Sequence, residues 1–208
     1  MQIKYISFLL VTLSVGHRIA LAQNSEDTTI NFDSEVVGKL PASWTGVSST
    51  WVIATDGANK ALKQTAKSKA DQSNICIQNK LKYQNLQMEA RIKSLEGGKE
   101  KGGGLVWRYH DAKNYYIARF NVVENNLKVY KVLKGIRKEI KSVNVKMKAN
   151  EWQTLKVAMI GYTLACYLND KKLLNVTDTS IPNAGSVGFW SRADAVSLFD
   201  DLKIKNLH

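Results

Sequence analysis

Hydrophobic and polar residues alternate through many short segments of this chain, and Gly, Asn or Asp separate the segments. In Tyr115–Val123, one face carries Tyr116, Ala118 and Phe120. A period of two is typical of β-strands whose two faces have different surroundings. Breaks such as Asp56-Gly57 are turn signals. Because strong helical patterns are absent, the sequence predicts an all-β protein.

Thirteen such runs predict strands, and their short, regular spacing indicates a sandwich or barrel. We predict that residues 28–208 form two antiparallel sheets packed face to face, with Phe120, Val157, Leu168 and Phe189 inside. The runs are Trp51–Ala54, Ala61–Gln64, Asn74–Gln78, Leu86–Leu95, Leu105–Tyr109, Tyr115–Val123, Leu127–Leu133, Ile136–Val145, Trp152–Ile160, Leu164–Leu168, Lys172–Val176, Val187–Ser191 and Val196–Ile204.

The other face of Tyr115–Val123 carries Arg119 and Asn121. Such groups cannot be buried unpaired in a core, so this face is expected to point outward. In the preceding strand, Trp107 is expected inward and Arg108 outward. The outer side of this sheet is therefore expected to present four residues together: Arg108, Tyr115, Arg119 and Asn121.

A later segment, Gly188–Asp194, adds an aromatic and a charged residue to the same region. If Phe189 is core, Trp190 and Arg192 face out or line a cleft edge. Two interpretations of Trp190 stay open, a sugar platform or a packed rim residue. Asp194 is expected to form a turn ion pair with Arg192, and Glu96–Gly104 a mobile loop beside this face.

The first residues are typical of an export signal. Lys4 precedes an apolar run, Tyr5–Val15, that is too short to span a bilayer. Ala20-Leu21-Ala22 matches a small-x-small cleavage pattern. We therefore expect a signal peptide at residues 1–22, a single domain at 23–208, and a periplasmic or extracellular location.

The chain of 208 residues has a formal charge of +12, and loss of Lys4 and Arg18 with the leader leaves +10. The lysines are spread along the chain, which favours a solvated surface over a site for acidic glycans. No nucleic-acid module is recognisable, so nucleic acid is not an expected partner. Cys76 and Cys166 are no disulfide framework, and buried free thiols are favoured over one disulfide.

The motifs along the chain resemble the bacterial family of exported 3-keto-disaccharide hydrolase domains. That family has a concanavalin-A-like jelly-roll β-sandwich of two antiparallel sheets, so the resemblance implies this fold and a carbohydrate ligand. It implies less about activity, because this fold hosts lectins, hydrolases and lyases. The matching motifs are Phe32-Asp33, Leu40-Pro41-Ala42-Ser43-Trp44, Gly104-Leu105-Val106-Trp107-Arg108-Tyr109, Asn114-Tyr115-Tyr116, Arg119, Asn125-Asn126, Trp152, Gly188–Asp194 and Phe199-Asp200-Asp201-Leu202.

Catalytic residues are not evident in the sequence. Retaining glycosidases need two carboxylates about 5–5.5 Å apart, but the family 16 motif of Glu-x-Asp-x-(x)-Glu is absent. His110 lacks metal-ligand spacing and is expected to be a solvated turn residue. Glu124 and Asp194 are the best acids on loops near the aromatic strands.

The ends of the domain carry two acids that could meet. Phe199 and Leu202 are out of step, which predicts a bulge at Asp200-Asp201. If the terminal strands pair, Asp33 and Asp200 could hold a structural Ca²⁺, a cation that prefers oxygen ligands. Turn capping is the favoured alternative.

We therefore expect an exported β-sandwich that binds carbohydrate. The residues do not decide whether it also hydrolyses or cleaves glycans or 3-keto-glycosides. A non-catalytic lectin-like or protein-interaction module of the cell envelope is the alternative. An acid pair or metal cluster would mark the enzyme, a coplanar aromatic strip the lectin, and a large apolar patch the protein partner.

Overall fold

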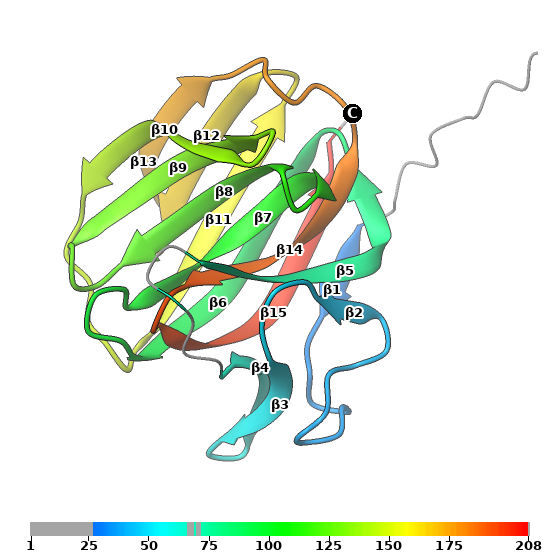
Figure 1. The fold of residues 1–208 in the computed structure, drawn as a ribbon, viewed down its shortest axis with the longest axis vertical. Helices are drawn as coiled ribbons and strands as arrows, with labels where there is room; N and C mark the ends of the chain where they lie inside the picture. The colour runs from blue at the N-terminus through cyan, green and yellow to red at the C-terminus, as the bar shows by residue number, and fades with distance from the viewer. Residues whose placement is uncertain (1–26, 66–68, 70–71, 208) are drawn as a thin grey trace, which may run out of the picture.

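The computed structural model describes residues 27–65, 69 and 72–207, and this part of the chain forms strands and turns without a helix. The expected leader, residues 1–22, lies outside the described residues. Figure 1 shows two sheets stacked one in front of the other, which confirms the predicted sandwich. No helix in the described residues is long and apolar enough to cross a membrane.

The structure describes fifteen strands, which are numbered here in chain order and are divided between the two sheets. They are β1 (Thr28–Ile30), β2 (Trp44–Gly46), β3 (Trp51–Asp56), β4 (Asn59–Gln64), β5 (Ser73–Tyr83), β6 (Leu86–Glu96), β7 (Gly102–Asp111), β8 (Asn114–Asn121), β9 (Asn126–Leu133), β10 (Ile136–Asn144), β11 (Trp152–Ile160), β12 (Thr163–Leu168), β13 (Lys171–Thr177), β14 (Gly185–Arg192) and β15 (Val196–Asn206).

One sheet has eight strands and the other has seven. The eight-stranded sheet follows the order β13-β12-β11-β6-β15-β4-β3, and β1 pairs with β15 as well. The seven-stranded sheet follows the order β10-β9-β8-β7-β14-β5-β2. The terminal strands β1 and β15 pair antiparallel, as expected of this type of sandwich.

The core lies between the two sheets and holds the residues predicted to be inside. Phe120, Val157, Leu168 and Phe189 belong to one buried cluster. Trp44 from β2 stacks on Phe189 with ring centroids 5.2 Å apart and planes 5° from parallel. Burying one such large apolar side chain contributes about 1.5–3 kcal/mol. This stacking attaches the N-terminal segment to the core.

Both cysteines are buried and free, so the alternative of a disulfide between Cys76 and Cys166 is wrong. Each thiol belongs to the core cluster. Burial raises the pKa of both thiols well above the ordinary value. They act here as small hydrophobic side chains.

All thirteen predicted strands are present, with ends that differ by a few residues. The two strands that the alternation did not predict, β1 and β2, have three residues each. A three-residue segment is too short to show a period. These strands form because β15 and β5 offer paired edges.

Candidate functional site

The face of the seven-stranded sheet that points away from the core is called here the outer face. Its predicted direction is confirmed, but it is buried rather than solvated, since Arg119 is 3% exposed and Asn121 is 1% exposed. A second buried hydrophobic cluster lies on it. The cluster consists of Ile75, Ile77, Val106, Tyr115, Ile117, Tyr130, Val132 and Trp190. Charged groups on this face are therefore held in a poorly hydrated environment.

Strand β7 lies between β14 and β8, and it has a glycine at the position between Trp190 and Arg119. Gly104 is paired with Trp190 of β14 on one side and with Arg119 of β8 on the other. A Cβ atom added to Gly104 would lie 2.4 Å from the Ala118 carbonyl oxygen and 2.8 Å from the Arg119 Cβ. The absence of a side chain lets the strands approach and leaves no side chain between Trp190 and Arg119.

Arg119 is the centre of a hydrogen-bond network on the outer face. Its Nη1 donates to Asn126 Oδ1 at 2.8 Å, and its Nη2 donates to Glu124 Oε2 at 2.8 Å. Nη2 also lies 3.3 Å from the Tyr130 hydroxyl oxygen. Burial acts to lower the pKa of Arg119, but Tyr130 and Glu124 outweigh it and the pKa is raised. The guanidinium is thus fixed in place and fully charged.

Glu124 is held as a carboxylate rather than poised as a base. Burial acts to raise its pKa, but hydrogen bonds from Arg119 and Asn126 outweigh burial, so the pKa of Glu124 lies below its ordinary value. Lys128 lies 3.8 Å from the same carboxylate oxygen. A carboxylate stabilised in this way is a weak proton acceptor at neutral pH.

A second arginine, Arg192, lies at the end of β14 beside Glu100. Arg192 Nη1 is 3.5 Å from Glu100 Oε1, and Asn121 Nδ2 donates to Glu100 Oε2 at 2.9 Å. The ion pair predicted between Asp194 and Arg192 is therefore wrong. Arg192 pairs instead with an acid that is 92 residues away in sequence.

Asp194 has a different role, because it fixes the turn that carries Glu100. Its carboxylate accepts backbone N–H groups from Gly98 at 2.7 Å, Lys99 at 3.3 Å and Glu100 at 3.2 Å. The N–H of Gly98 is the main cause that lowers the pKa of Asp194. The segment expected to be a loop thus contains an anchored turn, and its last three residues start β7.

A third arginine, Arg137 on β10, lies over two aromatic rings. Its guanidinium carbon is 4.9 Å from the Tyr130 ring centroid and 6.0 Å from the Trp190 ring centroid. Burial lowers the pKa of Arg137, and the nearby Arg192 lowers it further. We call Arg119, Arg137 and Arg192 the arginine cluster.

Three buried N–H groups of the outer face have no hydrogen-bond partner among the described residues: Trp190 Nε1, Arg119 Nε and Arg192 Nε. Leaving a buried donor unpaired costs about 1–3 kcal/mol. Trp190 is 2% exposed, so it is no open platform of the kind considered from the sequence. Its ring is packed, and its N–H is buried without a partner among the described residues.

Arg108 does not lie on the outer face, and its predicted position is wrong. It has φ of 45°, and the pairing of β7 with β8 shifts register between Trp107 and Asp111. The side chain is fully buried and donates to the carbonyl oxygens of Gln84, Gly161 and Ile181 at 2.7–2.9 Å. Arg108 therefore joins three turns at one end of the sandwich.

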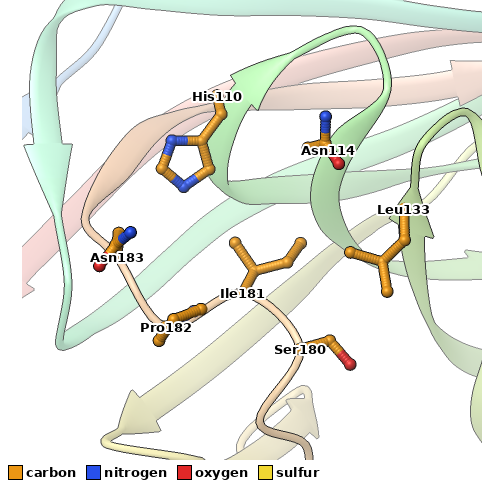
Figure 2. A pocket seen from close by; sticks show the side chains of 7 residues that line it. All are labelled: His110, Asn114, Leu133, Ser180, Ile181, Pro182 and Asn183. Carbon is orange, nitrogen blue, oxygen red and sulfur yellow. The ribbon is translucent and has the colours of Figure 1, made fainter.

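A pocket with a volume of about 300 Å³ lies at that end. Figure 2 shows the His110 ring directed toward the segment 180–183, with Asn183 beside it. His110 is exposed, as predicted, and lies at the end of β7. The lining has no arginine, lysine or carboxylate and consists of His110, Asn114, Leu133, Ser180, Ile181, Pro182 and Asn183.

The acids expected near a metal do not form a cluster. Asp33 is exposed, whereas Asp200 is buried and accepts from Asn59 Nδ2 at 2.9 Å and Arg91 Nη2 at 3.2 Å. The predicted bulge is confirmed, since the register of β15 with β6 shifts between Asp200 and Lys203. Within the described residues, no three His, Cys, Asp or Glu side chains are grouped to hold a metal ion.

Residues 29–205 match a protein family described as the 3-keto-alpha-glucoside-1,2-lyase-like domain. The chain belongs to this family. The match covers almost all the described residues, and it confirms the resemblance inferred from the motifs. No curated protein sequence matches the chain.

Solved structures with similar folds include carbohydrate-binding and carbohydrate-cleaving proteins. The carbohydrate-binding module CBM66 from Bacillus subtilis has a TM-score of 0.70 at 22% identity, covering 79% of this chain and 96% of the module. The VIP36 exoplasmic/lumenal domain, in a Ca²⁺/Man3GlcNAc-bound form, has a TM-score of 0.61 at 11% identity, covering 80% of this chain and 84% of the domain. A Bacillus licheniformis β-glucanase has a TM-score of 0.62 at 10% identity, covering 89% of this chain and 100% of the enzyme. These similarities establish a jelly-roll β-sandwich.

The structure brings together most of the residues singled out in the sequence. Tyr115, Arg119, Asn121, Trp190 and Arg192 share the outer face, and Asp194 supports it through the turn at residues 98–100. Four residues of this face were not predicted as site residues from the sequence: Glu100, Asn126, Tyr130 and Arg137. For Arg137, the available signal was its position on a strand next to the aromatic face.

Proposed function

We propose that this chain is an exported carbohydrate-binding β-sandwich whose binding surface is the outer face around the arginine cluster. The observation that carries the proposal is the convergence of three guanidinium groups with the buried rings of Tyr130 and Trp190. Sugars combine apolar C–H faces with a rim of hydroxyl groups. Aromatic rings suit the faces, and fixed donors suit the hydroxyl oxygens.

The unpaired donors define where hydroxyl groups could bind. Trp190 Nε1, Arg119 Nε and Arg192 Nε have no acceptor among the described residues. A ligand that supplies oxygen acceptors removes the cost of burying these N–H groups. A ligand would enter the site from the side of Arg192 and Glu124, whose side chains are 20% and 38% exposed.

Cleavage of a 3-keto-glycoside is the second candidate, and the family description supports it. Proton abstraction beside a ketone needs a base with a pKa near the working pH. Glu124 has a lowered pKa, and burial raises the pKa of Tyr115. Neither of these two groups suits that role, so binding is the first candidate and cleavage the second.

Calcium is not part of the proposed site. Asp200 already accepts hydrogen bonds from Asn59, Arg91 and the N–H of Asp201. A cation beside it would have to displace the Arg91 guanidinium. Export remains part of the proposal on the pattern of residues 1–22, and N-terminal sequencing of the protein recovered outside the cytoplasm should begin at Gln23.

A glycan array followed by calorimetric titration tests the site, with a 3-keto-disaccharide turnover assay in parallel. Trp190→Phe keeps a packed ring and removes the free N–H, and Arg192→Leu removes the second donor. Each should weaken glycan binding about tenfold, which corresponds to about 1.4 kcal/mol. We expect binding without turnover.

His110→Ala in the end pocket is the matched control and should bind as the wild type does. Loss of binding in this variant, with retention in Trp190→Phe, would move the site to the end of the sandwich. A protein that binds no glycan on the array would contradict the proposal altogether.

A further inference from the structure

We infer that the outer face takes a saccharide that carries a carboxylate, such as a uronic acid, and that Arg137 is the residue that pairs with it. This inference rests on the proposed function and adds a ligand class to the same site. It follows from the charges that the face leaves unbalanced.

Two of the three arginines in the cluster already have a carboxylate partner. Arg119 pairs with Glu124 at 2.8 Å, and Arg192 pairs with Glu100 at 3.5 Å. The Arg137 guanidinium makes no hydrogen bond or ion pair within the part of the chain that the structure describes; its contacts are with aromatic rings. The three arginines of the cluster therefore outnumber the carboxylates that pair with them by one.

The surroundings of Arg137 make that excess charge unfavourable. The guanidinium is partly buried, and Arg192 and Arg119 act on it as like charges. Tyr130 and Glu100 act in the opposite direction, but the pKa of Arg137 stays below its ordinary value. Contact with the rings of Tyr130 and Trp190 offsets part of this cost. An anion bound at Arg137 would relieve the repulsion, whereas a neutral sugar would not.

A carboxylate fits this position better than a hydroxyl group does. A guanidinium offers parallel N–H donors that match the two oxygens of a carboxylate. In a poorly hydrated site such a charged pair is stronger than it is in water. The unpaired N–H groups of Arg192 and Trp190 remain available for the hydroxyl oxygens of the same sugar ring.

The end pocket provides an internal comparison, because it has no arginine or lysine in its lining. A sugar bound there would gain nothing from a carboxylate. A preference for acidic over neutral saccharides is therefore expected of the outer face and not of the end pocket. This preference distinguishes the two sites whichever of them binds saccharides more tightly.

The test is calorimetric titration of the full chain with oligosaccharides of galacturonic, glucuronic, mannuronic and guluronic acid. Each is compared with its carboxyl-reduced counterpart, which has the same stereochemistry and no charge. At least one acid form should bind tenfold or more tightly than its reduced form, and added salt should narrow the difference. Sulfated oligosaccharides form a separate arm.

Arg137→Gln should abolish the preference for the acid form and keep the weaker affinity for the reduced form. Lys138→Gln, an exposed neighbour with the same change of charge, should keep the preference. Thermal unfolding checks that both variants are folded.

Each other result counts against the inference. Equal binding of acid and reduced forms, or a preference that survives Arg137→Gln, overturns it and leaves the proposed function standing. Binding of sulfated but not carboxylated saccharides overturns the choice of carboxylate. Absence of binding to every saccharide overturns both the inference and the proposed function.

Discussion

Arg108 donates a 2.7 Å hydrogen bond to the carbonyl oxygen of Ile181, 73 residues away in sequence. The same guanidinium reaches Gln84 and Gly161, so one buried side chain satisfies the carbonyl oxygens of three turns. Other long-range hydrogen bonds at this end of the sandwich join Gln84 to Pro182 and Gly161 to Asn85, but only Arg108 links all three turns.

Arg108→Met should therefore lower the free energy of unfolding by about 1–3 kcal/mol or more, because the carbonyl oxygen of Ile181 would be left buried and unpaired. Urea denaturation measures the loss. Lys138→Gln, a surface change, should stay within about 0.5 kcal/mol of the wild type. A loss for Arg108→Met as small as that of the control would contradict this account.

Asp178 should make stability depend on pH in the acid range. Burial acts to raise its pKa, but hydrogen bonds from Lys131 and Ser180 outweigh burial and lower the pKa to about 2 from the ordinary 3.8. A lowered pKa stabilises the folded state above about pH 4, and this stabilisation is lost as the pH falls toward 2. After allowance for solvent screening, it amounts to about 1–2 kcal/mol.

Asp178→Asn should thus be less stable than the wild type at pH 7, and the difference should shrink between pH 4 and pH 2. Urea denaturation across this range measures it. Glu139→Gln, which removes an exposed acid, is the control. A difference between wild type and Asp178→Asn that is constant with pH would show that the charge of Asp178 is not the cause.

Gly104→Ala should destabilise the seven-stranded sheet, because the added Cβ would lie 2.4 Å from the Ala118 carbonyl oxygen. Overpacking of this kind costs about 1–3 kcal/mol. Gly98→Ala is the matched control, since its Cβ would meet only Asp194 Oδ2, at 3.5 Å. Thermal unfolding should separate the two variants, and equal midpoints would mean that β7 and β8 can move apart at little cost.

The thiols of Cys76 and Cys166 should not react with a thiol reagent in the folded protein, because both are buried with raised pKa values. Only the thiolate is reactive, and burial disfavours it. Both should react after unfolding in guanidinium chloride. Rapid reaction of either thiol under native conditions would mean that the core opens locally.

The sequence predicted the features that depend on local alternation. Phe120 and Val157 lie on strands in which hydrophobic residues recur at every second position, and both are buried in the core. Arg108 broke the prediction because its positive φ and the register shift in β7 turn the side chain out of phase. The bulge in β15 was predictable because Phe199 and Leu202 break the alternation, whereas the sequence around Arg108 shows no such break.

The candidate site was only partly predictable for a different reason. Arg119 and Asn121 stand out because they are polar on an apolar strand. Arg137 does not stand out, because charged residues surround it on β10. Its significance comes from Tyr130 and Trp190 on other strands, and contacts between distant segments leave no local pattern.

Strand β15 lies inside the eight-stranded sheet, between β6 on one side and β4 and β1 on the other. During synthesis on the ribosome, β1, β4 and β6 all appear long before this partner exists. The edges that they offer to β15 stay open until residues 196–206 have emerged, so this sheet closes only after its last described strand has been made. A chain with such late, distant pairing folds slowly, and its exposed edges need protection while they wait. If the chain is exported, as proposed, that delay would keep it unfolded for passage across a membrane.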